Sequence, residues 1–189
     1  MDGRHLLILD LDETLIHSVE KPLEREPDFH VADYSVYRRP HLAEFLAAAS
    51  GWFDLAVWSS ASQRYVDAIV DRVFTDRGAL RFVWANDRCT RYLDDDTVQH
   101  FWLKNLTLVG STGYEMDRIL IVDDSAEKLK DNLTNHILVR PYEGAPGDRE
   151  LADLIPFLAV LKDAADVRTV EKRNWRYGPP YDGTVRGRA

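Results

Sequence analysis

The chain has 189 residues, a length that fits one domain with a sizeable core, and its 45% hydrophobic and 30% charged residues are typical of a globular protein. Its single cysteine excludes an internal disulfide, and its net charge of -8 argues against a broad nucleic-acid-binding surface, which needs clustered lysine and arginine. Because we find neither a signal peptide nor an apolar run of roughly 20 residues, we expect a cytoplasmic monomer with no membrane or nucleic-acid partner.

Apolar strands and amphipathic helices alternate along the chain, a pattern that predicts an α/β fold with a mostly parallel sheet. The continuous apolar run from His5 to Leu11 predicts a first strand that is covered on both faces. Pro40 suits the first turn of a helix over 40–50, and Gly51 is expected to end that helix. Further strands are predicted over 54–58, 80–85, 118–122 and 136–139, and further helices over 65–73, 126–133 and 148–161.

Local signals refine two parts of this pattern. Ser60 and Gln63 have the spacing of a capping box and predict the start of the helix over 65–73. Residues 17–38, rich in proline and charge, interrupt the first crossover between strands, although Tyr34 to Tyr37 can form a strand.

Residues 86–103 are predicted to form a hairpin whose tip is Asp94-Asp95-Asp96. That tip is either a solvated turn or a second cation site. Both this stretch and residues 17–38 are too short for a large cap domain, so we expect only small flaps beside the sheet.

We divide the chain into a domain over 1–167 and a C-terminal tail over 168–189. The tail holds six basic and two acidic residues, a local charge of +4, together with the aromatic residues Trp175, Tyr177 and Tyr181. It either folds back on the acidic body through these aromatics or serves as a docking arm for an acidic partner.

Acidic pairs and complementary polar groups follow several predicted strands. Asp10 and Asp12 come at the carboxyl end of the first strand, where open α/β sheets place their ligands. Residues two apart in a strand point the same way, so both carboxylates can approach one ligand. An isolated pair of this kind often does no more than cap the next element. Other strand ends, however, add Ser59, Lys104, Asp123 and Asp124.

Two adjacent carboxylates repel each other unless a cation or a shared proton relieves them. Carboxylates are ligands that Mg²⁺ prefers, and a lysine and a hydroxyl group can hold the oxygens of a phosphoryl group. The combined set therefore predicts a site for a divalent cation and a phosphoryl group.

The run Asp10-Leu11-Asp12-Glu13-Thr14-Leu15-Ile16-His17-Ser18 resembles the DxDxT motif of the haloacid dehalogenase superfamily. More narrowly, it resembles the phosphatases of the RNA polymerase II C-terminal domain. The resemblance covers roughly residues 5–162 and continues in order through Arg38-Arg39-Pro40, Trp58-Ser59-Ser60, Lys104-Asn105-Leu106 and Ile119-Leu120-Ile121-Val122-Asp123-Asp124-Ser125. It implies a single Rossmann-like domain with a central, mostly parallel sheet flanked by helices, small flap and hairpin insertions, and no large cap.

The resemblance also implies roles for the acidic residues. Asp10 would be the nucleophile that accepts the phosphoryl group as an aspartyl-phosphate. Asp12 would protonate the leaving oxygen and then activate the hydrolytic water, and Thr14 would orient it. Mg²⁺ would be held by Asp10, the main-chain carbonyl of Asp12, and Asp123 or Asp124 or both. Ser59 and Lys104 would hold the phosphoryl oxygens.

The expected substrate is phosphoserine or phosphothreonine in a protein, and a small-molecule or nucleic-acid-end phosphate is the alternative. The insert over 94–99 lengthens the approach to Lys104 relative to small phosphatases of this branch, which leaves the substrate open.

Two other classes of protein remain as alternatives to a phosphatase. A non-catalytic interaction module, like a mitochondrial translocase subunit that this branch resembles, would typically have lost part of the acidic set. A phosphoacceptor receiver domain lacks an acid two residues after its nucleophile, the position that Asp12 occupies.

Overall fold

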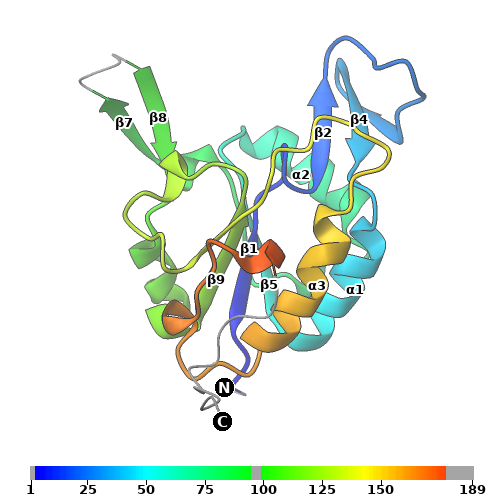
Figure 1. Ribbon diagram of the computed structural model, residues 1–189. Helices are drawn as coiled ribbons and strands as arrows, with labels where there is room; N and C mark the ends of the chain where they lie inside the picture. The colour runs from blue at the N-terminus through cyan, green and yellow to red at the C-terminus, as the bar shows by residue number, and fades with distance from the viewer. Residues whose placement is uncertain (1–2, 95–98, 178–189) are drawn as a thin grey trace.

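The computed structural model describes residues 3–94 and 99–177 and is built around a central five-stranded parallel sheet (Figure 1). The strand order is β10-β9-β1-β5-β6, so β1 lies in the middle and the chain adds strands first on one side of it and then on the other. This arrangement confirms the predicted α/β fold. The strands are β1 (Leu6–Leu9), β5 (Asp54–Trp58), β6 (Val83–Trp84), β9 (Ile119–Asp123) and β10 (His136–Leu138).

Both faces of the central sheet are covered, which explains the unbroken apolar sequence of β1. Leu7 and Leu9 pack in a cluster with three helices, whereas Leu6 and Ile8 face the other side. That second side is covered by short 3-10 segments. The helices are α1 (Leu42–Trp52), α2 (Gln63–Val73) and α3 (Glu150–Leu161), and the 3-10 segments on the opposite face include η3 (Leu106–Thr112) and η5 (Glu127–Leu129).

Two small antiparallel units stand at the end of the molecule where the central strands finish (Figure 1). One is a three-stranded sheet of order β2-β4-β3, which contains the expected strand near Tyr34. The other is the predicted hairpin of β7 and β8; of its predicted acidic tip, Asp94 ends β7, and Asp95 and Asp96 lie outside the described residues. The strands are β2 (Ile16–Val19), β3 (Phe29–Val31), β4 (Tyr34–Arg38), β7 (Thr90–Asp94) and β8 (Gln99–Leu103).

Several predicted boundaries are wrong. Helix α1 includes Gly51 and ends at Trp52, because the N–H of Phe53 still bonds to the Ala49 carbonyl before the chain turns extended. The predicted capping box does not form: Ser62 is the N-cap of α2 without a side-chain cap bond, and the Gln63 amide donates to Asp67 instead.

Two predicted elements are shorter than expected. The strand over 80–85 is reduced to β6, since the preceding segment forms a 3-10 turn over Arg77–Ala79 and an irregular link. The helix over 126–133 is reduced to the three residues of η5, after which turns lead into β10.

The described part of the tail, residues 168–177, packs against the body. Trp175 is buried, stacks on Phe157 of α3 and donates its indole N–H to the Leu138 carbonyl at 3.0 Å. Arg176 donates to the Glu150 carboxylate. The domain boundary at residue 167 stays a prediction, and residues 178–189 lie outside the description.

Candidate active site

Asp10 lies at the carboxyl end of β1, between the ends of β9 and β5. Its backbone N–H continues the sheet by donating to the Val122 carbonyl at 3.0 Å. Its carboxylate Oδ1 accepts from the Lys104 ammonium at 2.9 Å, and the same ammonium donates to Asp123 Oδ2 at 2.5 Å. All three side chains are buried. The topology thus brings together three residues that the sequence analysis selected from separate segments.

The charges of this cluster stabilise one another. Burial alone would favour neutral Asp10, but Lys104 and Lys128 outweigh it and hold the pKa of Asp10 below its ordinary value. Burial likewise opposes a charged Lys104, and the carboxylates of Asp10 and Asp123 raise its pKa above the usual range. Asp10 is therefore ionised at neutral pH, as a nucleophile must be.

Asp12 has a different environment from Asp10. Its Oδ1 accepts a hydrogen bond from the Tyr65 hydroxyl on α2 at 2.5 Å. Burial raises the pKa of Asp12 to about 6, although the Tyr65 hydrogen bond acts in the opposite direction. The pKa values of the two acids that flank Leu11 are thus shifted in opposite directions, the arrangement expected when one carboxylate attacks and the other transfers a proton. Tyr65 was assigned no role from the sequence.

A tight turn holds these acids in place. The N–H groups of Leu15 and Ile16 both donate to the Leu11 carbonyl, and Glu13 adopts a left-handed conformation with φ of 59°. Thr14 is buried in this turn, but its hydroxyl has no hydrogen-bond partner among the described residues. The predicted bond from Thr14 to Asp12 is not seen, and the orienting role of Thr14 stays a prediction.

Arg39 stabilises this turn through hydrogen bonds of its guanidinium group. It is almost fully buried and donates to the Thr14 carbonyl at 3.0 Å and to the Arg140 carbonyl at 2.8 Å. Its guanidinium also forms a two-bonded pair with Asp148, at 2.9 and 3.0 Å. The resemblance included Arg39 without a role, which only the long-range contacts supply.

Asp123 is the last residue of β9 and Asp124 follows it, and their side chains make different contacts. Asp123 Oδ1 accepts the Ser125 N–H at 2.9 Å, so both of its oxygens have donors. Asp124 Oδ1 is buried without a hydrogen-bond partner among the described residues, and burial raises the pKa of Asp124 to about 6. Carboxylate oxygens of Asp10, Asp123 and Asp124 lie within 4.8 Å of one another. This oxygen-only set with an unsatisfied acceptor fits a hard divalent cation.

Ser59 follows β5 and is buried beside this cluster. Its Oγ accepts the N–H of Ala61 at 3.1 Å, which leaves the hydroxyl hydrogen free to donate to a ligand. Helix α2 starts only at Gln63, so Ser59 precedes the helix N-terminus by one short turn instead of lying on it.

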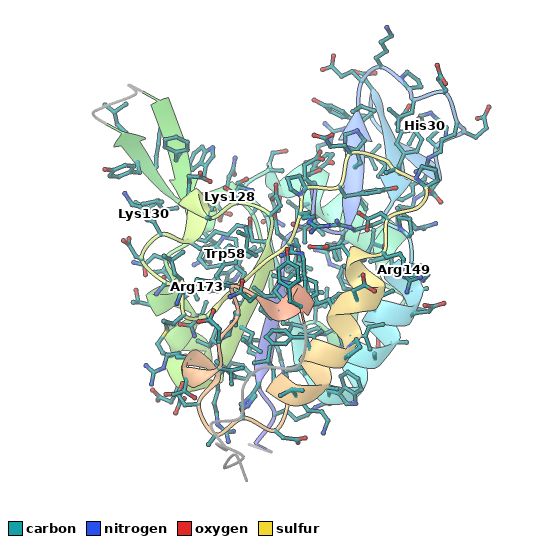
Figure 2. All side chains as sticks on the ribbon, in the orientation of Figure 1. His30, Trp58, Lys128, Lys130, Arg149 and Arg173 are labelled. Carbon is teal, nitrogen blue, oxygen red and sulfur yellow. The ribbon has the colours of Figure 1, made fainter. Side chains whose placement is uncertain are left out.

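Lys128 is the charged residue of the site that the sequence analysis missed. It lies in η5 (Figure 2). Its ammonium nitrogen lies 3.5 to 3.8 Å from carboxylate oxygens of Asp10, Asp123 and Asp124. Burial disfavours its charge, but these carboxylates outweigh that effect and raise the pKa of Lys128. The available signal was its spacing of four residues from Asp124, the spacing at which opposite charges meet on a helical turn.

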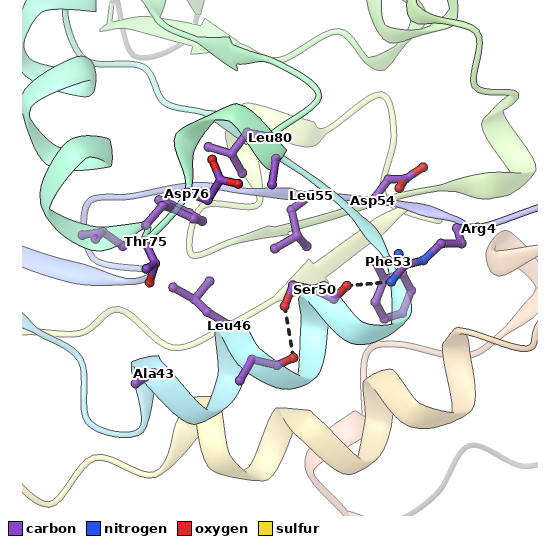
Figure 3. Close-up of a pocket in the computed structure, with 14 residues that line it drawn as sticks. Arg4, Ala43, Leu46, Ser50, Phe53, Asp54, Leu55, Thr75, Asp76 and Leu80 are labelled. Carbon is purple, nitrogen blue, oxygen red and sulfur yellow. Dashed lines mark hydrogen bonds between the residues drawn. The ribbon is translucent and has the colours of Figure 1, made fainter. Parts of the chain in front are cut away.

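Two cavities differ in their relation to this cluster. One of about 370 Å³ opens beside Asp12 and is bordered by Tyr34 and Tyr65. The other, of about 430 Å³, lies between α1 and the segment after α2, near Asp54 at the start of β5 (Figure 3). Because β5 begins there and ends at the acids, the second cavity is at the opposite end of the sheet and is separate from the candidate active site.

The fold and this arrangement of acids and lysines define a phosphatase of the haloacid dehalogenase type. The chain belongs to the NLI interacting factor-like phosphatase family, whose model matches residues 5–168. The family resemblance is therefore confirmed, and the chain is a phosphoric monoester hydrolase. The interaction-module and receiver-domain alternatives are set aside.

Named relatives are similar over most of the chain. CTD nuclear envelope phosphatase 1 of Xenopus tropicalis is 33% identical over 186 residues, which cover 90% of this chain and 72% of the relative. Nuclear envelope morphology protein 1 of Schizosaccharomyces pombe is 32% identical over 87% of this chain and 35% of its own length. A solved structure of the fission yeast RNA polymerase II CTD phosphatase Fcp1 bound to beryllium fluoride shares the fold, with a TM-score of 0.52 and 22% identity over 77% of this chain and 43% of that chain.

The expectation of a cytoplasmic location is wrong. The relatives are nuclear envelope proteins by name and point to the nuclear envelope instead of the plain cytoplasm. The expectation failed because the sequence patterns on which it was based do not record which organelle a chain meets. Within residues 3–94 and 99–177, no helix combines the length and the apolar character needed to cross a membrane.

Proposed function

We propose that this chain is a Mg²⁺-dependent protein phosphatase that hydrolyses phosphoserine or phosphothreonine through an aspartyl-phosphate on Asp10. The observation that carries the proposal is the contrast between two neighbouring carboxylates. Asp10 is kept ionised by Lys104, whereas burial raises the pKa of Asp12 to about 6. Such a divergence marks one group as nucleophile and the other as proton donor.

In the first step, a carboxylate oxygen of Asp10 attacks phosphorus and the bond between phosphorus and the ester oxygen breaks. Asp12 gives its proton to that leaving oxygen, so the serine or threonine departs as a neutral alcohol. In the second step, Asp12 takes a proton from water as the water oxygen attacks phosphorus. The bond between phosphorus and Asp10 then breaks, which regenerates the nucleophile and releases phosphate.

Ser59 and Lys104 hold the transferring group. The Ser59 hydroxyl hydrogen is uncommitted because its oxygen only accepts from Ala61. Lys104 has three N–H bonds, of which two are used by Asp10 and Asp123, so one can reach a phosphoryl oxygen. Donors fixed in a buried site stabilise developing charge at little reorganisation cost.

The residues that would hold Mg²⁺ are Asp10, the main-chain carbonyl of Asp12, and the pair Asp123 and Asp124. We assign the direct contact to Asp124, because its Oδ1 lacks a hydrogen-bond donor while both oxygens of Asp123 have one. When bound, Mg²⁺ neutralises phosphate charge and so lets one anion approach another. Asp123 then positions Lys104 and, through its carbonyl, His136.

A protein substrate is supported by the surroundings of the acids. Within the described residues, the structures next to these acids are a three-stranded sheet and a hairpin, and there is no large cap domain. A phosphorylated residue on a protein surface can therefore reach the acids. The cavity of about 370 Å³ beside Asp12 offers space for a neighbouring residue of the substrate. The solved relative Fcp1 is named as a phosphatase of the RNA polymerase II CTD.

The test compares phosphoserine and phosphothreonine peptides with small phosphomonoesters, each with Mg²⁺ and with a chelator. We expect a higher kcat/KM for the peptides, complete loss of turnover in chelator, and loss in Asp10→Asn. Equal or better kcat/KM for small esters would assign the enzyme to small-molecule phosphates. Undiminished turnover in chelator would remove the metal from the mechanism.

A further inference from the structure

Lys128, labelled in Figure 2, is a second lysine of the site. Its ammonium group contacts the site's acids, and the mechanism above does not use it. Its ammonium nitrogen lies 3.5 Å from Asp10 Oδ2, 3.7 Å from Asp123 Oδ1 and 3.8 Å from Asp124 Oδ1. These are the same three residues that form the candidate metal site. The ammonium group and a metal ion therefore seek the same carboxylates.

The backbone of Lys128 is anchored while its side chain has room to move. Its backbone carbonyl accepts a hydrogen bond from the backbone N–H of Lys104 at 2.8 Å. The next residue, Leu129, is buried in the same apolar cluster as Leu6 and Ile8 of β1. The Lys128 side chain is 22% exposed, whereas that of Lys104 is 0% exposed and makes two short bonds. Charged N–H···O bonds are normally about 2.7–2.9 Å, so Lys128 is held by longer and weaker contacts.

The charges explain why a movable lysine is useful here. Three carboxylates meet in this cluster, and Lys104 compensates one of them. Lys128 compensates a second carboxylate. Without this lysine, more of the cluster's negative charge would lack a counter-charge, which is strongly unfavourable in a buried site. A divalent ion supplies both of the missing positive charges by itself and repels the ammonium group from the same oxygens.

We infer that Lys128 is a tethered cation that occupies the carboxylate cluster in the metal-free protein and moves outward when Mg²⁺ binds. The inference rests on the metal site of the proposed function. It has two consequences. Mg²⁺ must displace Lys128, so the lysine weakens metal affinity. The metal-free fold depends on Lys128 for charge compensation, so it loses stability without that side chain.

The first test is a calorimetric titration with Mg²⁺ of the wild type, Lys128→Met and Lys130→Met. Methionine keeps much of the side-chain length without the charge. We expect Lys128→Met to lower the Kd for Mg²⁺ about tenfold or more, which corresponds to about 1.4 kcal/mol. Lys130 is the matched control, because it is exposed and its ammonium lies over the Tyr92 ring, 3.4 Å from the centroid. Lys130→Met should keep the wild-type Kd.

The second test is thermal unfolding of the same proteins in chelator and in Mg²⁺. Lys128→Met should melt below the wild type in chelator and gain more from Mg²⁺. Lys128→Arg, which keeps the charge, should resemble the wild type in both tests. If Lys128→Met fails to fold without metal, it is prepared in Mg²⁺ beside Lys128→Gln, and dissociation of the ion is measured directly.

The outcomes separate this inference from the proposed function. Mg²⁺ binding by the wild type with an equal or higher Kd in Lys128→Met would overturn the role of Lys128 alone. Absence of Mg²⁺ binding in every protein would overturn the metal site and, with it, this inference.

Discussion

Asp12 lies on a turn that Arg39 connects to the rest of the fold. The variant Arg39→Met tests how much this connection contributes to stability. The side chain is almost fully buried and makes its two-bonded pair with Asp148 at 2.9 and 3.0 Å. Methionine preserves the apolar stem but removes every donor. Asp148 would keep only its bond to the Glu150 N–H, and the Thr14 carbonyl would lose its donor.

The expected loss follows from these contacts. Removing one partner of a buried ion pair costs about 3–5 kcal/mol. Asp148 is partly hydrated, with a side chain 17% exposed, so we place the loss at the lower end, about 3 kcal/mol. For a chain of this size, that corresponds to a melting temperature about 6–12 °C lower.

Urea denaturation of the wild type, Arg39→Met and Arg38→Met measures this loss. Arg38 is the matched control, because it is the adjacent arginine, is exposed and donates to the Arg72 carbonyl at 2.7 Å. Its replacement should cost about 1 kcal/mol or less. A loss below about 1 kcal/mol for Arg39→Met, or equal losses for both variants, would refute the reasoning.

Three further predictions concern the site and the tail. Burial raises the pKa of Asp12 to about 6, so kcat/KM for a phosphoserine peptide should fall as pH rises above 6 and the proton donor is lost. The Tyr65 hydrogen bond favours charged Asp12, so Tyr65→Phe should move that fall to higher pH, and an unmoved profile would contradict this coupling. Lys104→Met should lower kcat by about 100-fold or more, measured at saturating substrate, and near-normal turnover would exclude Lys104 from charge stabilisation. Trp175→Ala should cost about 3–5 kcal/mol in urea denaturation because the ring is buried against Phe157, whereas a loss near zero would show that residues 168–177 do not support the core.

The central sheet was predictable because its strands carry a strong local signal. β1 is buried on both faces and is accordingly apolar without interruption. Since the carboxyl ends of parallel strands meet at one edge, Asp10, Ser59 and Asp123 were expected to converge, and the structure brings them together. Element ends were less predictable, as Gly51 shows, because the bond from Phe53 to Ala49 outweighs the weak preference of glycine for a helix end.

The residues around the acids could not be assigned from local sequence. Arg39 and Asp148 are 109 positions apart, and Tyr65 reaches Asp12 from another element. Such contacts depend on how helices dock on the sheet, which no local periodicity records. Lys128 was overlooked because the segment over 126–133 was expected to be a helix, whereas the short η5 turn directs that lysine to the carboxylates.

The central claim is that Asp10 carries the phosphoryl group between two displacements, and a burst experiment with Asp12→Asn tests it most directly. The substrate is para-nitrophenyl phosphate, whose leaving group departs without a proton, so the variant can still complete the first step. We predict one rapid equivalent of nitrophenolate per protein, slow turnover afterwards, and a phosphoryl group mapped to Asp10 by mass spectrometry. Steady turnover at the wild-type rate without a phosphorylated Asp10, or undiminished turnover by Asp10→Asn, would contradict the account.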